Sequence, residues 1–141
     1  MKKLRPFHLA IPVQNLAKAR NFYKNILECS EGRKDTHWVD FDFFGHQLVI
    51  HEDQNSHQNS KVGNIVDGKT VPIPHFGILL DWDEFHNFAE MLRIKKVQFQ
   101  IEPYIRFEGE IGEQATMFFY DPSGNALEFK AFKDEQQIFA K

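Results

Sequence analysis

The chain has a single cysteine, Cys29, so it forms no internal disulfide, which agrees with a reducing cytoplasm. No apolar run approaches the roughly 18–20 residues that a membrane-spanning helix needs. The amino-terminal residues MKKLRPFHL carry charge but not the apolar centre of a signal peptide. We therefore expect a cytoplasmic protein with no membrane partner, in which the lone thiol has a structural role.

The chain also lacks an excess of either charge. Its net charge is −3, with 42% hydrophobic and 26% charged residues, so nothing favours nucleic acid or an anionic membrane as a partner. With 141 residues it is expected to be one domain, or one domain built from two similar halves, that folds without a metal. Fifteen phenylalanines are the one compositional excess, and they indicate an aromatic core or an aromatic-lined pocket.

Two halves of the chain repeat the same order of elements. Each half opens with a strand, continues with a helix and ends with a hairpin. The first half has these elements at Phe7–Val13, a helix capped by Asn15, and Trp38–Phe44 with Gln47–His51 around a turn at Gly45-His46. The second half has them at His75–Leu80, a helix capped by Asp81 or Asp83, an extended run Val97–Phe107, and Ala115–Tyr120 with Ala126–Phe132.

These halves set the expected boundaries. We predict a first module over residues 5–52, a polar surface loop over 53–70, a second module over 71–133 and a tail over 134–141. The loop is rich in Asn, Ser, Gln and Gly and is expected to be mobile, or folded over a site. The tail from Lys133 is expected to be helical or disordered.

Strand alternation places three ionisable residues on the faces opposite the large apolar side chains. They are His8, His75 and Glu128, each near a small residue in the alternation. If the halves curl around a common axis, two imidazoles and one carboxylate converge, which is the ligand set that favours non-haem Fe(II). Taken singly, each histidine is also explained as a hydrogen-bonded core residue, and Glu128 as an exposed residue paired with Lys130.

The sequence resembles the vicinal oxygen chelate superfamily, which includes glyoxalases, bleomycin-resistance proteins and extradiol dioxygenases. FHLAIPVQNLAKARNFYKNIL is similar to its opening strand and helix, and QATMFFYDPSGNALEFKAF to its closing hairpin. FDFFGHQLVIH, VPIPHFGILL and EPYIRFEGE resemble small bacterial predicted dioxygenases of the extradiol type. The resemblance implies an α+β fold of two βαβββ modules. These form an open, incomplete eight-stranded barrel, with helices outside, around one divalent metal held by His8, His75 and Glu128.

Two further histidines are candidates through this resemblance. In glyoxalase-type members the last strand of the first module supplies another ligand, and His51 stands at the corresponding place in LVIHED. His46 resembles the acid–base histidine of extradiol enzymes. Strict alternation turns His46 and His51 to opposite faces, so a regular strand cannot aim both at one site unless a bulge intervenes.

The sequence departs from the large extradiol enzymes at their catalytic tyrosine, where it has Phe118, and in having only one pair of modules. Tyr104 and Arg106 share a strand face, and Arg106 either holds a substrate oxygen or pairs with Glu108 or Glu110. Phe119 and Tyr120 are further candidates for substrate contact. For Trp38, Phe41 and Phe43, the sequence leaves two roles open, the lining of an aromatic pocket or core packing.

Three functions compete. The first is an extradiol-type dioxygenase, an oxidoreductase that uses Fe(II) on a small oxygen-bearing substrate. The second is a glyoxalase-like isomerase or lyase that uses Ni, Zn or Mn, and it gains if His51 is a ligand. The third is a metal-free binding protein like the bleomycin-resistance relatives. The open strand edges of such a fold also lead us to expect a homodimer.

Overall fold

A computed structural model describes residues 3–56 and 63–141 of the chain. Contacts divide the described residues into two compact units, one of residues 3–56 with 121–124, the other of residues 63–120 with 125–141. Each unit mixes one main helical segment with a sheet, so the predicted α+β class is confirmed. Neither sheet closes on itself, as expected for the modules of an open barrel.

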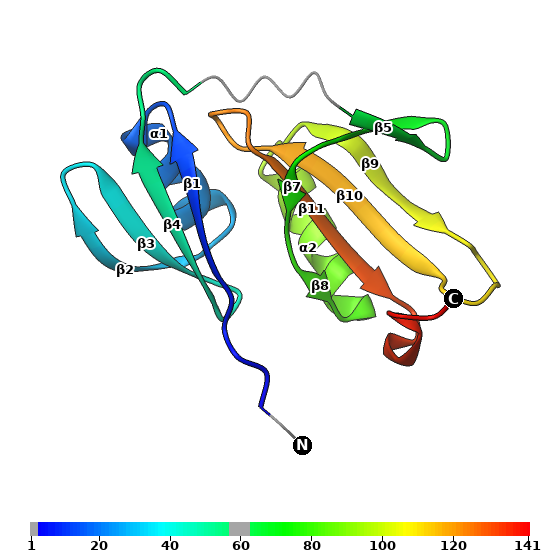
Figure 1. The fold of residues 1–141 in the computed structure, drawn as a ribbon. Coiled ribbons are helices and arrows are strands. Elements are labelled where there is room, and N and C mark those ends of the chain that lie inside the picture. The colour runs from blue at the N-terminus through cyan, green and yellow to red at the C-terminus, as the bar shows by residue number, and fades with distance from the viewer. Residues whose placement is uncertain (1–2, 57–62) are drawn as a thin grey trace. The chain divides into compact units, whose positions relative to one another are not determined.

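The first unit has the order strand, helix, three strands (Figure 1). Its elements are β1 (His8–Val13), α1 (Leu16–Asn21), a π-helical continuation η1 (Phe22–Ile26), β2 (Ser30–Asp35), β3 (Trp38–Phe43) and β4 (His46–Glu52). The sheet order is β1-β4-β3-β2, with β1 parallel to β4 and the other pairs antiparallel.

The second unit repeats this order after an added hairpin. Its elements are β5 (Gly63–Val66), β6 (Lys69–Pro72), β7 (His75–Phe76), β8 (Leu79–Leu80), α2 (Trp82–Ile94), β9 (Phe99–Arg106), β10 (Gln114–Tyr120), β11 (Ala126–Phe132) and the 3₁₀ turn η2 (Glu135–Gln137). The sheet order is β7-β11-β10-β9, and β8 also pairs with β11. Both short strands run parallel to β11.

Side-chain caps begin both helices where the sequence predicts. The Asn15 side chain accepts a hydrogen bond from the Lys18 N–H, and Asp81 and Glu84 form a capping box. In the first unit, the Tyr23 ring is fully buried beside Phe41 and Phe43, and its hydroxyl donates to Asp121 at 2.8 Å. Burial, together with the Asp121 charge, raises the pKa of Tyr23 well above its ordinary value.

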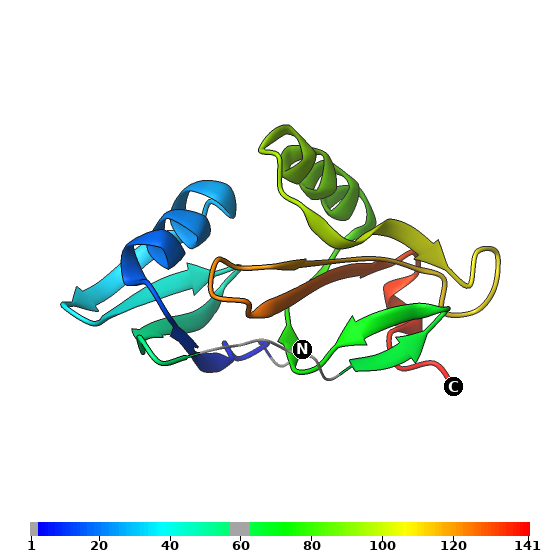
Figure 2. The ribbon, with the colours of Figure 1, turned by 90° about the horizontal axis from the view of Figure 1, so that it is seen from above.

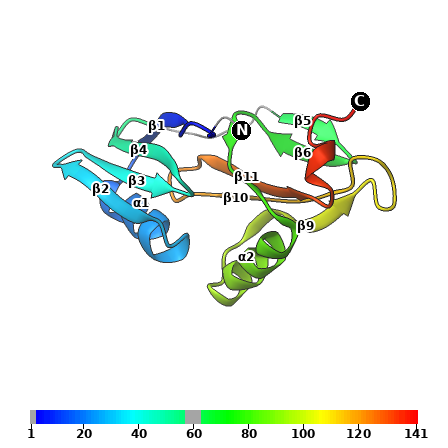
Figure 3. The ribbon, with the colours of Figure 1, turned by 90° about the horizontal axis from the view of Figure 1, so that it is seen from below.

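In the second unit, the sheet is covered on its two faces by different elements. α2 packs on one face of the sheet (Figure 2). There Phe88 contacts Phe129, and Phe129 stacks on Phe119. The hairpin β5–β6 lies on the opposite face, as the view from below also shows (Figure 3). Alternation along β11 therefore sends Leu127 and Phe129 toward the helix and Glu128 toward the hairpin side.

The structure corrects several details of the predicted elements. The polar sequence of β2 did not predict a strand, but β2 completes the three strands after the helix that the resemblance implies. The turn of the first hairpin is Phe44-Gly45, both with positive φ, rather than Gly45-His46. The end of the predicted loop forms β5 and β6, while residues 57–62 of that loop lie outside the described residues. The predicted strand 75–80 is interrupted between β7 and β8. No helix in the described ranges is long and apolar enough to cross a membrane.

Candidate functional site

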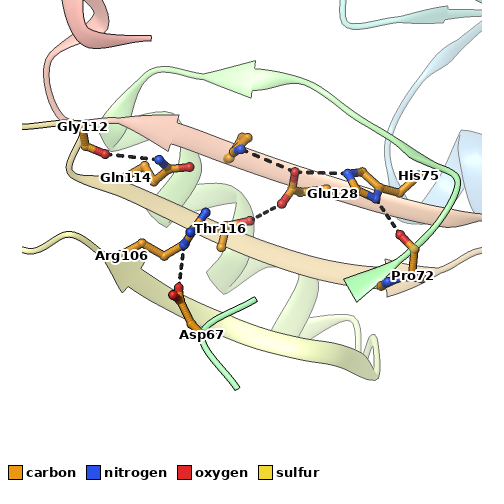
Figure 4. A network of polar contacts seen from close by, with 9 residues as sticks. Asp67, Pro72, His75, Arg106, Gly112, Gln114, Thr116 and Glu128 are labelled. Atoms are coloured by element: carbon orange, nitrogen blue, oxygen red, sulfur yellow. Dashed lines mark hydrogen bonds and ion pairs between the residues drawn. The ribbon is translucent and has the colours of Figure 1, made fainter. Parts of the chain in front are cut away.

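The second unit brings His75 and Glu128 together. β7 pairs with β11 so that His75 is level with Ala126, which puts its side chain close to Glu128 on the same face. The His75 Nε2 lies 3.6 Å from the Glu128 Oε1 (Figure 4). Two ligands of one metal ion, with bonds of about 2.1 Å, lie about 3.0–3.4 Å apart, so this pair is near the spacing that a shared ion requires.

The His75 ring is oriented by a backbone carbonyl. Its Nδ1 is 2.7 Å from the Pro72 carbonyl oxygen, and because a carbonyl only accepts, Nδ1 carries the proton. In the neutral ring, Nε2 is left with a lone pair directed toward Glu128 (Figure 4). A histidine that donates one ring N–H to a carbonyl and offers the other nitrogen is the usual arrangement of a metal-ligating histidine.

Glu128 is mostly buried and has further partners. The Thr116 hydroxyl donates to its Oε2 at 2.8 Å, and the Lys130 Nζ lies 3.7 Å from Oε1. The contact with Lys130 is the pairing that the sequence offered as the alternative to a ligand role, and it coexists with the approach of His75. The carboxylate is thus held by Thr116 on one oxygen, while the other oxygen faces His75 and a cation.

Phe118 lies directly opposite Glu128 in the register of β10 and β11. Its ring meets the His75 ring edge-on, with centroids 5.1 Å apart. The position where the resemblance places a catalytic tyrosine therefore carries a ring without a hydroxyl beside the candidate ligands.

Gly77 is the small residue that stands near His75 in the strand alternation, but it does not leave open space there. Instead, a Cβ on Gly77 would lie 1.5 Å from the Glu128 carbonyl oxygen. Only glycine allows the backbone this close to β11, and this approach keeps His75 at Glu128.

His8 in the first unit is held in the same way as His75. Its Nδ1 lies 2.8 Å from the Gln47 Oε1, and the Gln47 amide nitrogen is directed to Asp40 at 3.4 Å, which fixes the amide orientation. The His8 Nδ1 is therefore the donor, and its Nε2 keeps a lone pair. Both histidines therefore keep the lone pair on the same ring nitrogen.

The matched registers of the two units identify the first-unit counterpart of Glu128. His75 is level with Ala126, and Glu128 comes two residues later; His8 is level with Gln47, and two residues later comes Val49. His51 shares this face but is level with Pro12, about 13 Å further along β4 than Gln47. The position that corresponds to a carboxylate ligand is therefore apolar.

His46 lies on the other face of β4 from His8 by the same alternation. The pairing of β4 is regular with both of its neighbours, so no bulge turns His46 around. Its Nδ1 accepts the Phe7 N–H at 2.8 Å, which leaves Nε2 as the protonated nitrogen in the neutral ring.

Tyr104 and Arg106 share the face of Glu128 and contact the turn of the β5–β6 hairpin. The Arg106 Nε donates to Asp67 at 2.6 Å, and the Tyr104 hydroxyl donates to the same carboxylate oxygen at 3.1 Å. The Arg106 hydrogen bond is the main reason that the pKa of Asp67 is lowered. The partner of Arg106 is therefore Asp67, rather than the predicted Glu108 or Glu110.

Of the aromatic residues predicted to contact a substrate, some lie on the face of Glu128 and others in the core. Tyr120 is on the face of Glu128, whereas Phe119 is fully buried on the face that packs against α2, so it is not available to a ligand bound near Glu128. Phe41 and Phe43 are buried around Tyr23 in the first unit. Phe41, Phe43 and Phe119 are therefore core residues.

Sequence reasoning missed Thr116 and Gln114 on the site face. Both alternate with Phe118 along QATMFFY, and the turn that follows fixes the pairing with β11. That register could have identified them, because it puts every second residue of β10 on the same face of the sheet as Glu128. Within residues 3–56 and 63–141, no three His, Cys, Asp or Glu side chains gather as a metal site.

The comparisons with known proteins identify the family. The model of the Glyoxalase/Bleomycin resistance protein/Dioxygenase superfamily matches residues 5–129. The chain belongs to this superfamily. Its members typically use divalent metals, and they include both lyases and dioxygenases. A search of curated proteins finds no match.

Solved structures agree with membership of the superfamily. A glyoxalase/bleomycin resistance protein/dioxygenase from Alicyclobacillus acidocaldarius is 33% identical, with 96% of each chain covered and a TM-score of 0.79. Two others show the fold alone. A fosfomycin resistance protein from Listeria monocytogenes is 19% identical, covering 98% of this chain and 99% of that chain, TM-score 0.68. A lactoylglutathione lyase from Agrobacterium tumefaciens is 16% identical, covering 93% and 96%, TM-score 0.66.

Proposed function

We propose that the protein is a metal-dependent dioxygenase of the extradiol type, which binds divalent iron through His8, His75 and Glu128. Its substrate is a small molecule with two adjacent oxygens, such as a catechol. Two imidazoles and one carboxylate are the donor set that suits non-haem Fe(II) and leaves positions for substrate and dioxygen. Mn, Ni and Zn suit the same donor atoms, so the metal is part of what the experiment must determine.

The observation that carries this proposal is that Val49 occupies the first-unit position that corresponds to Glu128. A four-ligand, glyoxalase-type site needs a donor from the first module at the level that corresponds to Glu128, and the matched registers put an isopropyl group there. A three-ligand set follows, with more coordination positions left for small molecules. The common anchoring of the two histidines, each through Nδ1, supports the same set.

The surrounding residues have separable tasks in this proposal. Thr116 holds the Glu128 carboxylate in position, and Pro72 fixes the His75 tautomer. Lys130 brings a positive charge next to Glu128, where it favours the ionised form of a bound substrate oxygen. Phe118 supplies an apolar wall but no proton, so proton transfer in this protein cannot use a tyrosine at that position.

The test is oxygen consumption by protein reconstituted anaerobically with Fe(II) and then given catechol and oxygen. We expect uptake of about one dioxygen per catechol and loss of uptake in His75→Ala. Gln100→Met, an exposed change on β9, serves as a control that should keep the native rate. No uptake above the His75→Ala background with any of a set of catechols would contradict the dioxygenase proposal.

One observation favours a second candidate, a metal-free binding protein. Glu128 already has Thr116 and Lys130 as partners, so its charge is compensated without an ion. Calorimetry of chelator-treated protein separates the two candidates. Unchanged catechol affinity after removal of metal would favour the binding protein, and loss of affinity would favour the metalloenzyme.

A further inference from the structure

Gln114 has a buried acceptor without a hydrogen bond. Its residue is 7% exposed, its Nε2 donates to the Gly112 carbonyl at 3.2 Å, and its Oε1 is unpartnered among the buried side-chain atoms of the described ranges. The Gly112 carbonyl fixes the amide orientation, since the flipped amide would bring two acceptors together. Native proteins rarely leave such an oxygen unsatisfied, because it lowers stability, so it indicates a missing donor.

Arg106 is a candidate donor to act with it. It lies directly opposite Gln114 in the pairing of β9 and β10, so their side chains leave the sheet as neighbours on one face (Figure 4). Asp67 takes only the Nε of the Arg106 guanidinium, and the guanidinium has further N–H groups in a planar fork. An acceptor and a donor therefore stand side by side.

Gln114 and Arg106 lie on the same face of the sheet as the candidate metal ligands His75 and Glu128, further along β10. Phe118 is opposite Glu128, and Gln114 is four residues earlier on β10, which is about 13 Å along the strand. Thr116 lies between them on the same face. A molecule held at His75 and Glu128 that extends along β10 meets Gln114 and Arg106 with its far end.

We propose that Gln114 and Arg106 form a second binding point of the substrate, which takes an end group with an N–H next to a carbonyl oxygen, such as a primary carboxamide. The N–H donates to the Gln114 Oε1, and the carbonyl oxygen accepts from Arg106. The inference rests on the proposed function for the other end of the substrate. It adds that the natural substrate is elongated, with its adjacent oxygens and its carboxamide at opposite ends.

The test compares two probes that differ only at this end, 3-(3,4-dihydroxyphenyl)propanamide and the corresponding methyl ester, which lacks the N–H. Binding to metal-loaded protein is measured by calorimetry without oxygen. We expect the native protein to bind the amide at least tenfold more tightly than the ester. Gln114→Met should remove this preference, while plain catechol binds within twofold of native and the control Gln100→Met changes nothing. A preference that survives in Gln114→Met overturns the proposal.

A second readout does not depend on metal or activity. In metal-free protein, Gln114→Met removes the unsatisfied acceptor, which stabilises, and also the hydrogen bond from Nε2 to the Gly112 carbonyl, which destabilises, so its unfolding midpoint should stay close to that of the native protein. If catechol fails to bind the metal-loaded protein, the proposed function fails, and the second binding point is tested alone with 3-phenylpropanamide and methyl 3-phenylpropanoate. A shift of the Gln114 side-chain amide NMR signals by the amide only would support it, and no shift with either would overturn it.

Discussion

Replacing Gly77 by alanine is expected to separate β7 and β8 from β11 and so to separate His75 from Glu128. The added Cβ would lie 1.5 Å from the Glu128 carbonyl oxygen and 2.6 Å from its carbon, whereas ordinary contacts begin near 3.4 Å. The backbone must therefore move by about 2 Å. Hydrogen bonds such as the one from the Lys130 N–H to the Ile78 carbonyl, at 3.2 Å, do not survive that movement.

The size of the effect follows from the contacts that are lost. Two or three backbone hydrogen bonds, at about 1 kcal/mol each, with some strain that remains, give a loss of about 2–4 kcal/mol in the free energy of unfolding. Urea unfolding of metal-free protein measures this loss. Because the proposed ligands His75 and Glu128 are pulled apart, chelator competition should also show metal affinity falling at least tenfold.

The matched control is Gly32→Ala. Its added Cβ would lie 3.4 Å from the Asp40 Cβ, which is an ordinary contact, so stability should change by no more than about 0.5 kcal/mol. If Gly77→Ala unfolds at the native urea concentration and binds metal like the native protein, the close approach of β7 and β8 to β11 does not hold the ligand pair, and the reasoning is refuted.

Other predictions test the first unit and the assembly. His51→Ala should keep metal affinity within twofold of native, while Val49→Glu should raise it; a tenfold loss in His51→Ala would make that histidine a ligand. Tyr23→Phe removes the hydrogen bond to Asp121 and should cost about 1–3 kcal/mol in urea unfolding. Because the folded-state pKa of Tyr23 is raised, the contribution of the Tyr23 hydroxyl to the free energy of unfolding is complete below the unfolded tyrosine pKa of about 10 and is lost as pH rises above it. If Tyr23→Phe showed the same dependence of stability on pH as the native protein, this explanation would be contradicted. Burial raises the pKa of Cys29 to about 12, so a disulfide reagent at pH 8 should label it only after unfolding, and rapid labelling of native protein would be the contrary result. We also propose a homodimer, because the described sheets end in open strand edges; light scattering should give twice the mass of one chain, and a monomer at all concentrations would exclude it.

Local sequence rules predicted the closing hairpin and both helix starts. The turn Asp121-Pro122-Ser123-Gly124-Asn125 specifies the ends of β10 and β11, and alternation then fixes which residues share the face of Glu128. The same rule, applied one residue further, would have put Phe119 on the helix face. Asn15 and Asp81 cap their helices because short polar side chains can accept the first free N–H groups.

Features that depend on contacts between distant segments were not predictable in this way. The break between β7 and β8 arises because Gly77 meets the backbone of β11, about fifty residues away, and nothing in PHFGILL signals that contact. The turn of the β5–β6 hairpin, Asp67-Gly68 with both φ values positive, is a local hairpin signal that the sequence does carry. What the sequence does not show is that Asp67 is held by Tyr104 and Arg106 from β9. The unpartnered oxygen of Gln114 appears only when every hydrogen bond around it is known.

The proposed function requires His8, His75 and Glu128 to hold one metal ion. Its most direct test is metal analysis of protein purified without oxygen or chelator, alongside His75→Ala and Glu128→Ala, with folding of each variant checked by circular dichroism. We expect close to one iron per chain in the native protein and almost none in either folded variant. Native protein that binds no metal even after reconstitution, or variants that keep the full amount, would contradict it.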